Sequence, residues 1–251
     1  MAYKCLYTCG DSWTYGDEIC DYTNVTVNDE TIRYYNTWPW FLAQELGISI
    51  CVNEGLGGRS NQRIFRRTLN FIFKWIESGK NPSDLLIVLG WTSPERYEIP
   101  VLNKDNVTNY VGLTVRNPVH KRHLFEESTL KQLDIFNSLF YELVDTNGTS
   151  TDDNIRQLRL MRIVCEYYGI RYYDFFSVVT HPMTIKNRFK TNEFNNLYGK
   201  QFEQTLTEKK WPKHKFRHPT IESHKNWAME LKSFINNEHN IQPMWQGRKI
   251  L

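Results

Sequence analysis

Residues 84–90 read DLLIVLG, and this stretch decides the fold. Every residue from 85 to 89 is apolar, so the pattern predicts a strand buried on both faces, as in a parallel sheet covered by helices on both sides. Gly90 ends the strand in a turn. Three shorter apolar segments are also predicted to be strands: 4–9, 48–52 and 170–175.

Apolar residues at helical spacing lie between these strands. They predict helices at 38–46, 61–78, 124–144, 152–168 and 220–236. This alternation of strands and helices favours an α/β fold with a mostly parallel sheet and helices on both faces. Residues 17–36 are predicted to be a loop. Residues 92–123, with a hairpin near 110–115, and 180–217 are predicted to be insertions in a single domain spanning 1–251.

The composition excludes several classes of protein. Of 251 residues, 40% are apolar and 24% charged, which excludes wholesale disorder. A net charge of +3 is too small to indicate nucleic-acid binding by itself. No apolar run approaches the ~20 residues of a membrane span, and the first residues lack a signal-peptide pattern. Five scattered cysteines predict no disulfide framework, so a cytoplasmic location is expected.

Three turns follow predicted strands directly, at 10–13, 53–61 and 90–93. In a parallel sheet these turns gather at the carboxyl edge, where ligands bind. Ser12 offers a hydroxyl there, and glycine-rich turns offer backbone N–H groups that can hold a developing oxyanion. His218, just before the last helix, is of the residue type that most often acts as a base for serine.

At these residues the sequence resembles the SGNH (GDSL-type) hydrolase superfamily, in four blocks between residues 10 and 228. The resemblance implies a three-layer, flavodoxin-like sandwich, with Ser12 as nucleophile, Gly58 as oxyanion donor and His218 as base. The layout is also similar to intracellular SGNH proteins of tailed phages, which implies host cytoplasm. The candidate oxyanion and substrate-binding residues are Asp11, Trp13, Gly58, Ser60, Asn61, Trp91 and Thr92.

Two positions depart from the family pattern. Thr92 stands where the family has asparagine, and loss of one oxyanion donor costs roughly 10²–10³ in rate. Lys215 stands three residues before His218, where the family has aspartate, and a lysine cannot orient the imidazole. Asp174 and Glu222 are the substitute carboxylates that the sequence offers.

Each of these residues has a structural interpretation as well. The structural alternative for Ser12 is a helix N-cap, and for the glycines a tight strand–helix turn, which is compatible with an oxyanion role. A phosphate loop is disfavoured because the turn lacks GxGxxG. The set His214, His218 and His224 lacks carboxylate or thiolate partners at ligand spacing, so no metal is predicted. Trp13 and Trp91 either stack on a substrate or pack in the core.

The sequence therefore predicts a serine esterase that hydrolyses esters or O-acetyl groups of a small or carbohydrate-like substrate, without a cofactor. The alternative is a catalytically impaired protein of the same fold that binds an anionic ligand, a nucleic acid or a protein partner. The run 209–217 holds five Lys or Arg and no acid, so it is either a solvated loop or a binding rim for an anion. The oligomeric state is not assigned.

Overall fold

A computed structural model describes residues 3–19, 29–102, 105, 108–113, 125–143, 149–178, 200–215 and 217–238. Its central sheet has four parallel strands in the order β2-β1-β3-β6. This is the order of a flavodoxin-like sheet, so the predicted fold class is confirmed. The strands are β1 (Cys5–Gly10), β2 (Ile50–Asn53), β3 (Leu85–Trp91) and β6 (Arg171–Phe176).

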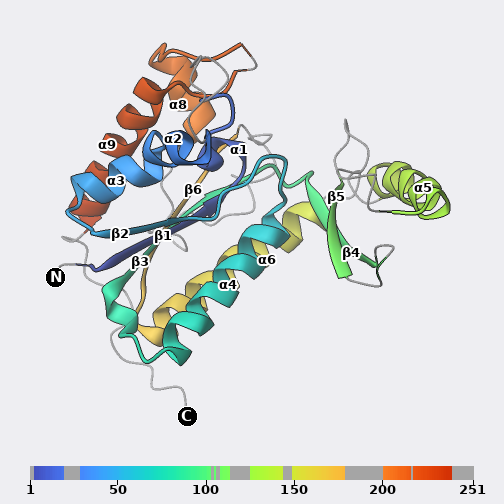
Figure 1. The fold of residues 1–251 in the computed structure, drawn as a ribbon, viewed down its shortest axis with the longest axis horizontal. Helices are drawn as coiled ribbons and strands as arrows, with labels where there is room; N and C mark the ends of the chain where they lie inside the picture. The colour runs from blue at the N-terminus through green and yellow to red at the C-terminus, as the bar shows by residue number, and fades with distance from the viewer. Residues whose placement is uncertain are drawn as a thin grey trace.

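Helices cover both faces of this sheet (Figure 1). On one face lie α1 (Ser12–Tyr15), α2 (Asp29–Tyr35), α3 (Trp38–Glu45), α8 (Phe202–Glu208) and α9 (Ile221–Glu238). On the other face lie α4 (Asn61–Glu77) and α6 (Thr149–Tyr168). A short 3₁₀ helix, Pro82–Asp84, leads into β3. The result is the three-layer arrangement that the sequence pattern predicts.

Strand β3 shows why the sheet needs two helical layers. All seven of its residues are buried. Leu86 and Val88 pack into one core with α3 and α9, whereas Leu85, Ile87 and Leu89 pack into the other core with α4 and α6. Successive side chains of a strand point to opposite faces, so an unbroken apolar run supplies both cores at once.

The insertion at 92–123 contains the predicted hairpin, which begins earlier than expected. Strand β4 (Tyr97–Leu102) pairs antiparallel with β5 (Thr108–Leu113). Together with α5 (Glu127–Leu143), the hairpin extends away from the sheet, beyond its carboxyl edge (Figure 1). The single-domain interpretation of the whole chain stays a prediction.

The prediction of an uninterrupted loop at 17–36 is wrong, because α2 forms within it. Residues 20–28 lie outside the described part. The polar segment 180–217 likewise contains α8. Across the described residues, no helix combines the length and the apolar character needed to cross a membrane.

Candidate functional site

Ser12 begins helix α1 at the carboxyl end of β1, close to the sheet order's reversal point between β1 and β3. The side chain of Asp11 caps this helix by accepting a hydrogen bond from the backbone N–H of Trp13, at 3.1 Å. The interpretation of Ser12 as the N-cap is therefore wrong. Ser12 is 6% exposed, and its hydroxyl forms no hydrogen bond with any described residue, His218 included.

A buried network joins the three predicted turns. The Thr92 hydroxyl donates to Oδ2 of Asp11 at 2.8 Å. The Asn61 amide bonds to both backbone groups of Thr92, accepting at 2.8 Å and donating at 3.0 Å. All three side chains are fully buried. The single hydroxyl hydrogen of Thr92 is thus directed to Asp11, and Thr92 fixes the position of the cap beside Ser12.

The glycine-rich turn lies directly against α1. A Cβ on Gly55 would come within 2.7 Å of the Tyr15 backbone nitrogen, so only glycine fits there. Gly58 adopts a left-handed φ of 68°. The backbone N–H groups of Gly58 and Ser12 donate to no described residue. The turn therefore lies against α1, and its Gly58 N–H has no partner among the described residues. Ser60 ends the turn as the N-cap of α4, accepting from the Arg63 N–H at 3.3 Å.

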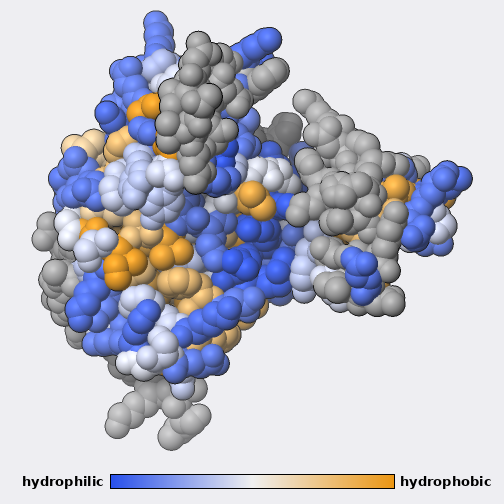
Figure 2. Space-filling view, in the orientation of Figure 1, coloured by the Kyte–Doolittle hydropathy of each residue, from blue (hydrophilic) through white to orange (hydrophobic). Residues whose placement is uncertain are grey.

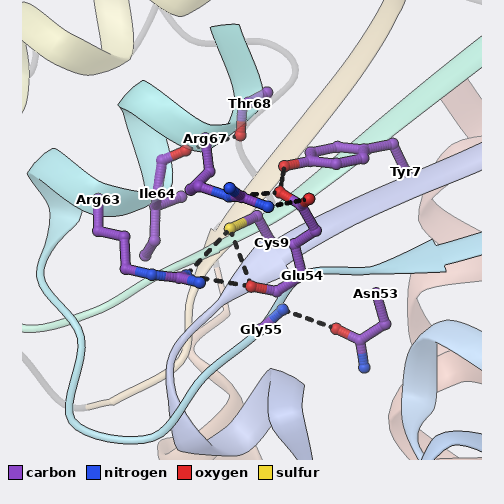
Figure 3. Close-up of polar contacts among 9 residues, drawn as sticks. All are labelled: Tyr7, Cys9, Asn53, Glu54, Gly55, Arg63, Ile64, Arg67 and Thr68. Carbon is purple, nitrogen blue, oxygen red and sulfur yellow. Dashed lines mark hydrogen bonds and ion pairs between the residues drawn. The ribbon is translucent and has the colours of Figure 1, made fainter. Parts of the chain in front are cut away.

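Glu54 anchors the start of this turn (Figure 3). Its carboxylate accepts from the Tyr7 hydroxyl at 2.8 Å and from Nε of Arg67 at 3.0 Å. Arg63 donates to the Glu54 backbone carbonyl at 3.1 Å, and the Cys9 thiol lies 3.4 Å from the same oxygen. Burial raises the pKa of the Cys9 thiol to about 11, so it is neutral and a poor nucleophile.

His218 lies close to the segment that carries Ser12. Its ring centroid is 6.3 Å from that of Trp13. Nδ1 is 2.7 Å from Oε2 of Glu18, and the His218 backbone N–H donates to the same oxygen at 3.2 Å. The Glu18 side chain is only 5% exposed, and its backbone has a left-handed φ of 69°. A buried carboxylate thus holds the imidazole through one ring nitrogen.

The sequence did not identify Glu18, and neither proposed substitute does its work. Asp174 accepts from Nε1 of Trp91 at 2.9 Å and from the Tyr172 hydroxyl at 2.6 Å. These two aromatic residues belong to the core under α4 and α6, whereas Trp13 belongs to the opposite core. Burial raises the pKa of Asp174 to about 6. Glu222 is exposed in the first turn of α9.

Both candidate tryptophans are buried in the fold. Trp91 is 1% exposed. Trp13 is 5% exposed and packs edge-on against Phe202, with ring centroids 5.1 Å apart. Each therefore packs in a core, which matches the structural interpretation of these residues.

The histidines near the end of the chain differ in role. His224 is fully buried, and its Nδ1 accepts from the Trp38 backbone N–H at 3.2 Å. Burial, reinforced by His214 and His218, lowers the pKa of His224 to about 3, so its ring is neutral. Within the described ranges, no three His, Cys, Asp or Glu side chains are arranged to hold a metal ion.

The basic run precedes His218 as a turn closed by pairing of Lys213 with Pro219. Lys209 forms an ion pair with Glu230 of α9, and Lys213 donates to the Thr207 hydroxyl at 2.9 Å. Part of this charge is therefore engaged within the fold.

A surface pocket of about 300 Å³ lies at the other end of α1, lined by Tyr15, Asn53 and residues of α2, without Ser12 or His218.

Comparison with known proteins gives one family match. A family model described as "Family of unknown function (DUF6071)" matches residues 17–197. No curated protein sequence matches this chain.

Three solved structures are similar at low identity. A protein of the lipolytic G-D-S-L family from Desulfitobacterium hafniense is 15% identical, with a TM-score of 0.31 and coverage of 92% of this chain and 99% of that chain. A carbohydrate esterase family 2 enzyme from Myceliophthora fergusii is 11% identical, with a TM-score of 0.40 and coverage of 93% and 66%. A lipolytic G-D-S-L family member from Veillonella parvula is 11% identical, with a TM-score of 0.29 and coverage of 92% and 96%.

Proposed function

The chain belongs to the DUF6071 family, whose description assigns no activity. From the geometry of the site, we propose that the protein hydrolyses esters through an acyl-enzyme on Ser12. The observation that carries the proposal is the buried Glu18 carboxylate that holds His218 by Nδ1, beside the helix that Ser12 begins. A hydrogen bond from Nδ1–H to a carboxylate leaves Nε2 as the acceptor, which is the tautomer a serine hydroxyl needs.

In the proposed first step, Nε2 of His218 takes the proton from Ser12 as the oxygen bonds to the ester carbonyl carbon. The carbonyl oxygen becomes an oxyanion. Collapse of this intermediate breaks the bond to the alcohol, which leaves with the proton from His218. Water then repeats the sequence on the acyl-enzyme, giving the free acid and restoring both residues. No step requires a metal or an organic cofactor.

The oxyanion is assigned to the backbone N–H groups of Ser12 and Gly58. Two observations support this role: neither group donates to a described residue, and the left-handed Gly58 lies in the turn packed on α1. Donors that are already fixed need no rearrangement when the charge develops. Thr92 contributes by holding Asp11, since its hydroxyl hydrogen is used there. A direct contribution of Thr92 to the oxyanion stays a prediction.

With this mechanism we propose that the chain is a member of the SGNH hydrolase superfamily and that its substrate is a small or carbohydrate-like ester. A cytoplasmic location and a tailed-phage origin both stay predictions. Partners other than substrate are not assigned.

A fluorophosphonate probe on the purified protein tests the nucleophile. We expect wild type to be labelled and Ser12→Ala not to be. Labelling of His218→Ala should fall strongly, because the probe reacts with an activated hydroxyl. Ser78→Ala is the matched control, since Ser78 is exposed at the far end of α4 and should leave labelling unchanged. Equal labelling of wild type and Ser12→Ala would remove the proposal.

The alternative is a non-catalytic protein that binds a ligand at the same edge. The Ser12 hydroxyl has no hydrogen-bond partner among the described residues, and the hydroxyl of Thr92 is committed to Asp11. A wild-type protein that is folded but not labelled would favour this alternative.

A further inference from the structure

Arg59 directly follows Gly58 in the turn between β2 and α4. Its side chain is partly buried, and its Nε is enclosed without a hydrogen-bond partner. Within the described part of the chain, Arg59 forms neither an ion pair nor a hydrogen bond through its side chain. A guanidinium is usually paired when it leaves water, because loss of hydration is costly for a charge.

Three carboxylates around the turn are already paired with other arginines. Glu98 accepts from Arg66 at 2.6 Å, and Oδ2 of Asp11 lies 3.4 Å from Arg96. The third, Glu54, is held by Arg67. The carboxylate of Asp17 lies beside Gly57 in the same turn. None of these four acids forms an ion pair with Arg59.

The local field is positive at Arg59. Burial lowers the pKa of this guanidinium, and repulsion from Arg63 and Arg66 lowers it further, with Glu98 opposing them in part. Arg63 does not offset its own charge with an acid, since its contacts are the Glu54 carbonyl and the Cys9 sulfur. An anion arriving here would relieve both the lost hydration and the repulsion.

A chain of hydrogen bonds also connects the residues after Arg59 to the helix that carries the proposed nucleophile. Two residues further on, Asn61 holds Thr92, and Thr92 holds Asp11, which caps the helix that starts at Ser12. Figure 2 shows hydrophilic residues gathered over the start of α4, between the body of the sheet and the β4–β5 hairpin. Arg59 therefore belongs to the turn that carries Gly58 and leads directly into Asn61.

We propose that Arg59 binds an anionic group, a carboxylate or a phosphate, on the substrate whose ester reaches Ser12. This deepens the proposed function and rests on it. The Arg59 guanidinium suits a single anion, because its planar fork matches two oxygens of one carboxylate or phosphate. The ligand class is thus a small anionic ester, in contrast to a long polyanion, which would need a row of cations.

Two matched pairs of acetate esters test this specificity. The first pair is 4-acetoxybenzoate and its neutral methyl ester; the second is acetylated glycerol phosphate and acetylated glycerol. We expect Arg59→Gln to lower kcat/KM for the anionic member of one pair by roughly 10- to 100-fold, the usual worth of a charged hydrogen bond, and to spare the neutral member. A loss confined to the benzoate pair would identify the bound group as a carboxylate, and a loss confined to the glycerol pair would identify it as a phosphate.

Arg171→Gln is the control, because Arg171 is exposed at the amino end of β6, at the opposite edge of the sheet. It should leave all four esters unchanged. An equal loss on charged and neutral esters in Arg59→Gln would overturn the proposal, since it would indicate a general structural role.

A binding measurement separates this proposal from the esterase itself. Inorganic phosphate and 4-hydroxybenzoate are titrated calorimetrically into Ser12→Ala and into Ser12→Ala with Arg59→Gln. Binding of either anion that weakens at least tenfold without Arg59 supports the anion site, even if wild type cleaves no ester. Ester turnover with neither a charge preference nor Arg59-dependent binding overturns the anion site and leaves the esterase standing. Absence of both turnover and binding contradicts both proposals.

Discussion

The Glu18 carboxylate lies 2.7 Å from Nδ1 of His218, a residue 200 positions later in the chain. The same oxygen accepts the His218 backbone N–H at 3.2 Å. Two hydrogen bonds to one buried oxygen fix the ring and its backbone together. The direction of Nε2 is therefore set by a residue only six positions after Ser12.

Glu18→Gln should lower ester kcat/KM by about 10³–10⁴, because a neutral amide neither selects the Nδ1–H tautomer nor stabilises the imidazolium. Steady-state kinetics measures the loss, and circular dichroism checks that the fold is kept. Glu222→Gln is the matched control, since this exposed carboxylate should be dispensable. Equal activities of the two variants would contradict the assignment of Glu18.

Adding Lys215→Asp to Glu18→Gln should raise kcat/KM at least tenfold above that of Glu18→Gln alone. The substitution puts a carboxylate three residues before His218, where the SGNH pattern has its acid. A purely structural role of Glu18 would not be rescued by a charge at a different position. The double variant and Glu18→Gln alone are compared over a pH series, and identical profiles would count against the orienting role.

Thr92→Val should reduce the free energy of unfolding by about 1–3 kcal/mol, since it deprives the buried Asp11 carboxylate of a hydrogen bond at nearly constant volume. Urea denaturation measures this change. Thr207→Val, at an exposed position of α8, should cost no more than ~0.5 kcal/mol. Similar losses in both variants would show that the Thr92 hydroxyl has no special role.

His224→Asn should make the protein more resistant to acid. The native pKa of His224 is lowered to about 3 from 6.5, so between these values the unfolded chain binds a proton that the native protein does not. Wild type therefore loses stability as pH falls below 6.5, by about 1.4 kcal/mol per pH unit from this group. Asparagine cannot be protonated there and can still accept from Trp38. The free energy of unfolding of both proteins is measured between pH 3 and pH 7. The same pH dependence in both would show that His224 is not its origin.

The core elements could be predicted because their local pattern and their burial agree. Residues 85–89 are apolar on both faces, and β3 is buried on both. The turn residues were also identifiable, because strand ends of a parallel sheet meet at one edge; Asn61 and Thr92 are indeed bonded there. Helix α2 was missed because its sequence, DETIRYY, is short, polar and aromatic, without an apolar period.

Glu18 could not be predicted for a different reason. Its side chain reaches His218 from a left-handed backbone, a conformation that non-glycine residues rarely adopt and that no spacing rule indicates. Asp174 was a reasonable substitute on sequence grounds, because it lies near the end of a strand. The alternation of side chains along β6 turns it to the other core, toward Trp91.

The carboxylate bonded to His218 comes from Glu18, in the amino-terminal segment. This has a consequence for the residues just before His218. With Glu18 as the orienting acid, that stretch need not supply a carboxylate at a fixed distance, and in this chain it holds five Lys or Arg and no acid. A signature defined by an acid three places ahead of the histidine would pass over any relative built in this way. Such relatives would be found by asking which buried carboxylate follows the short helix that begins with the proposed nucleophile.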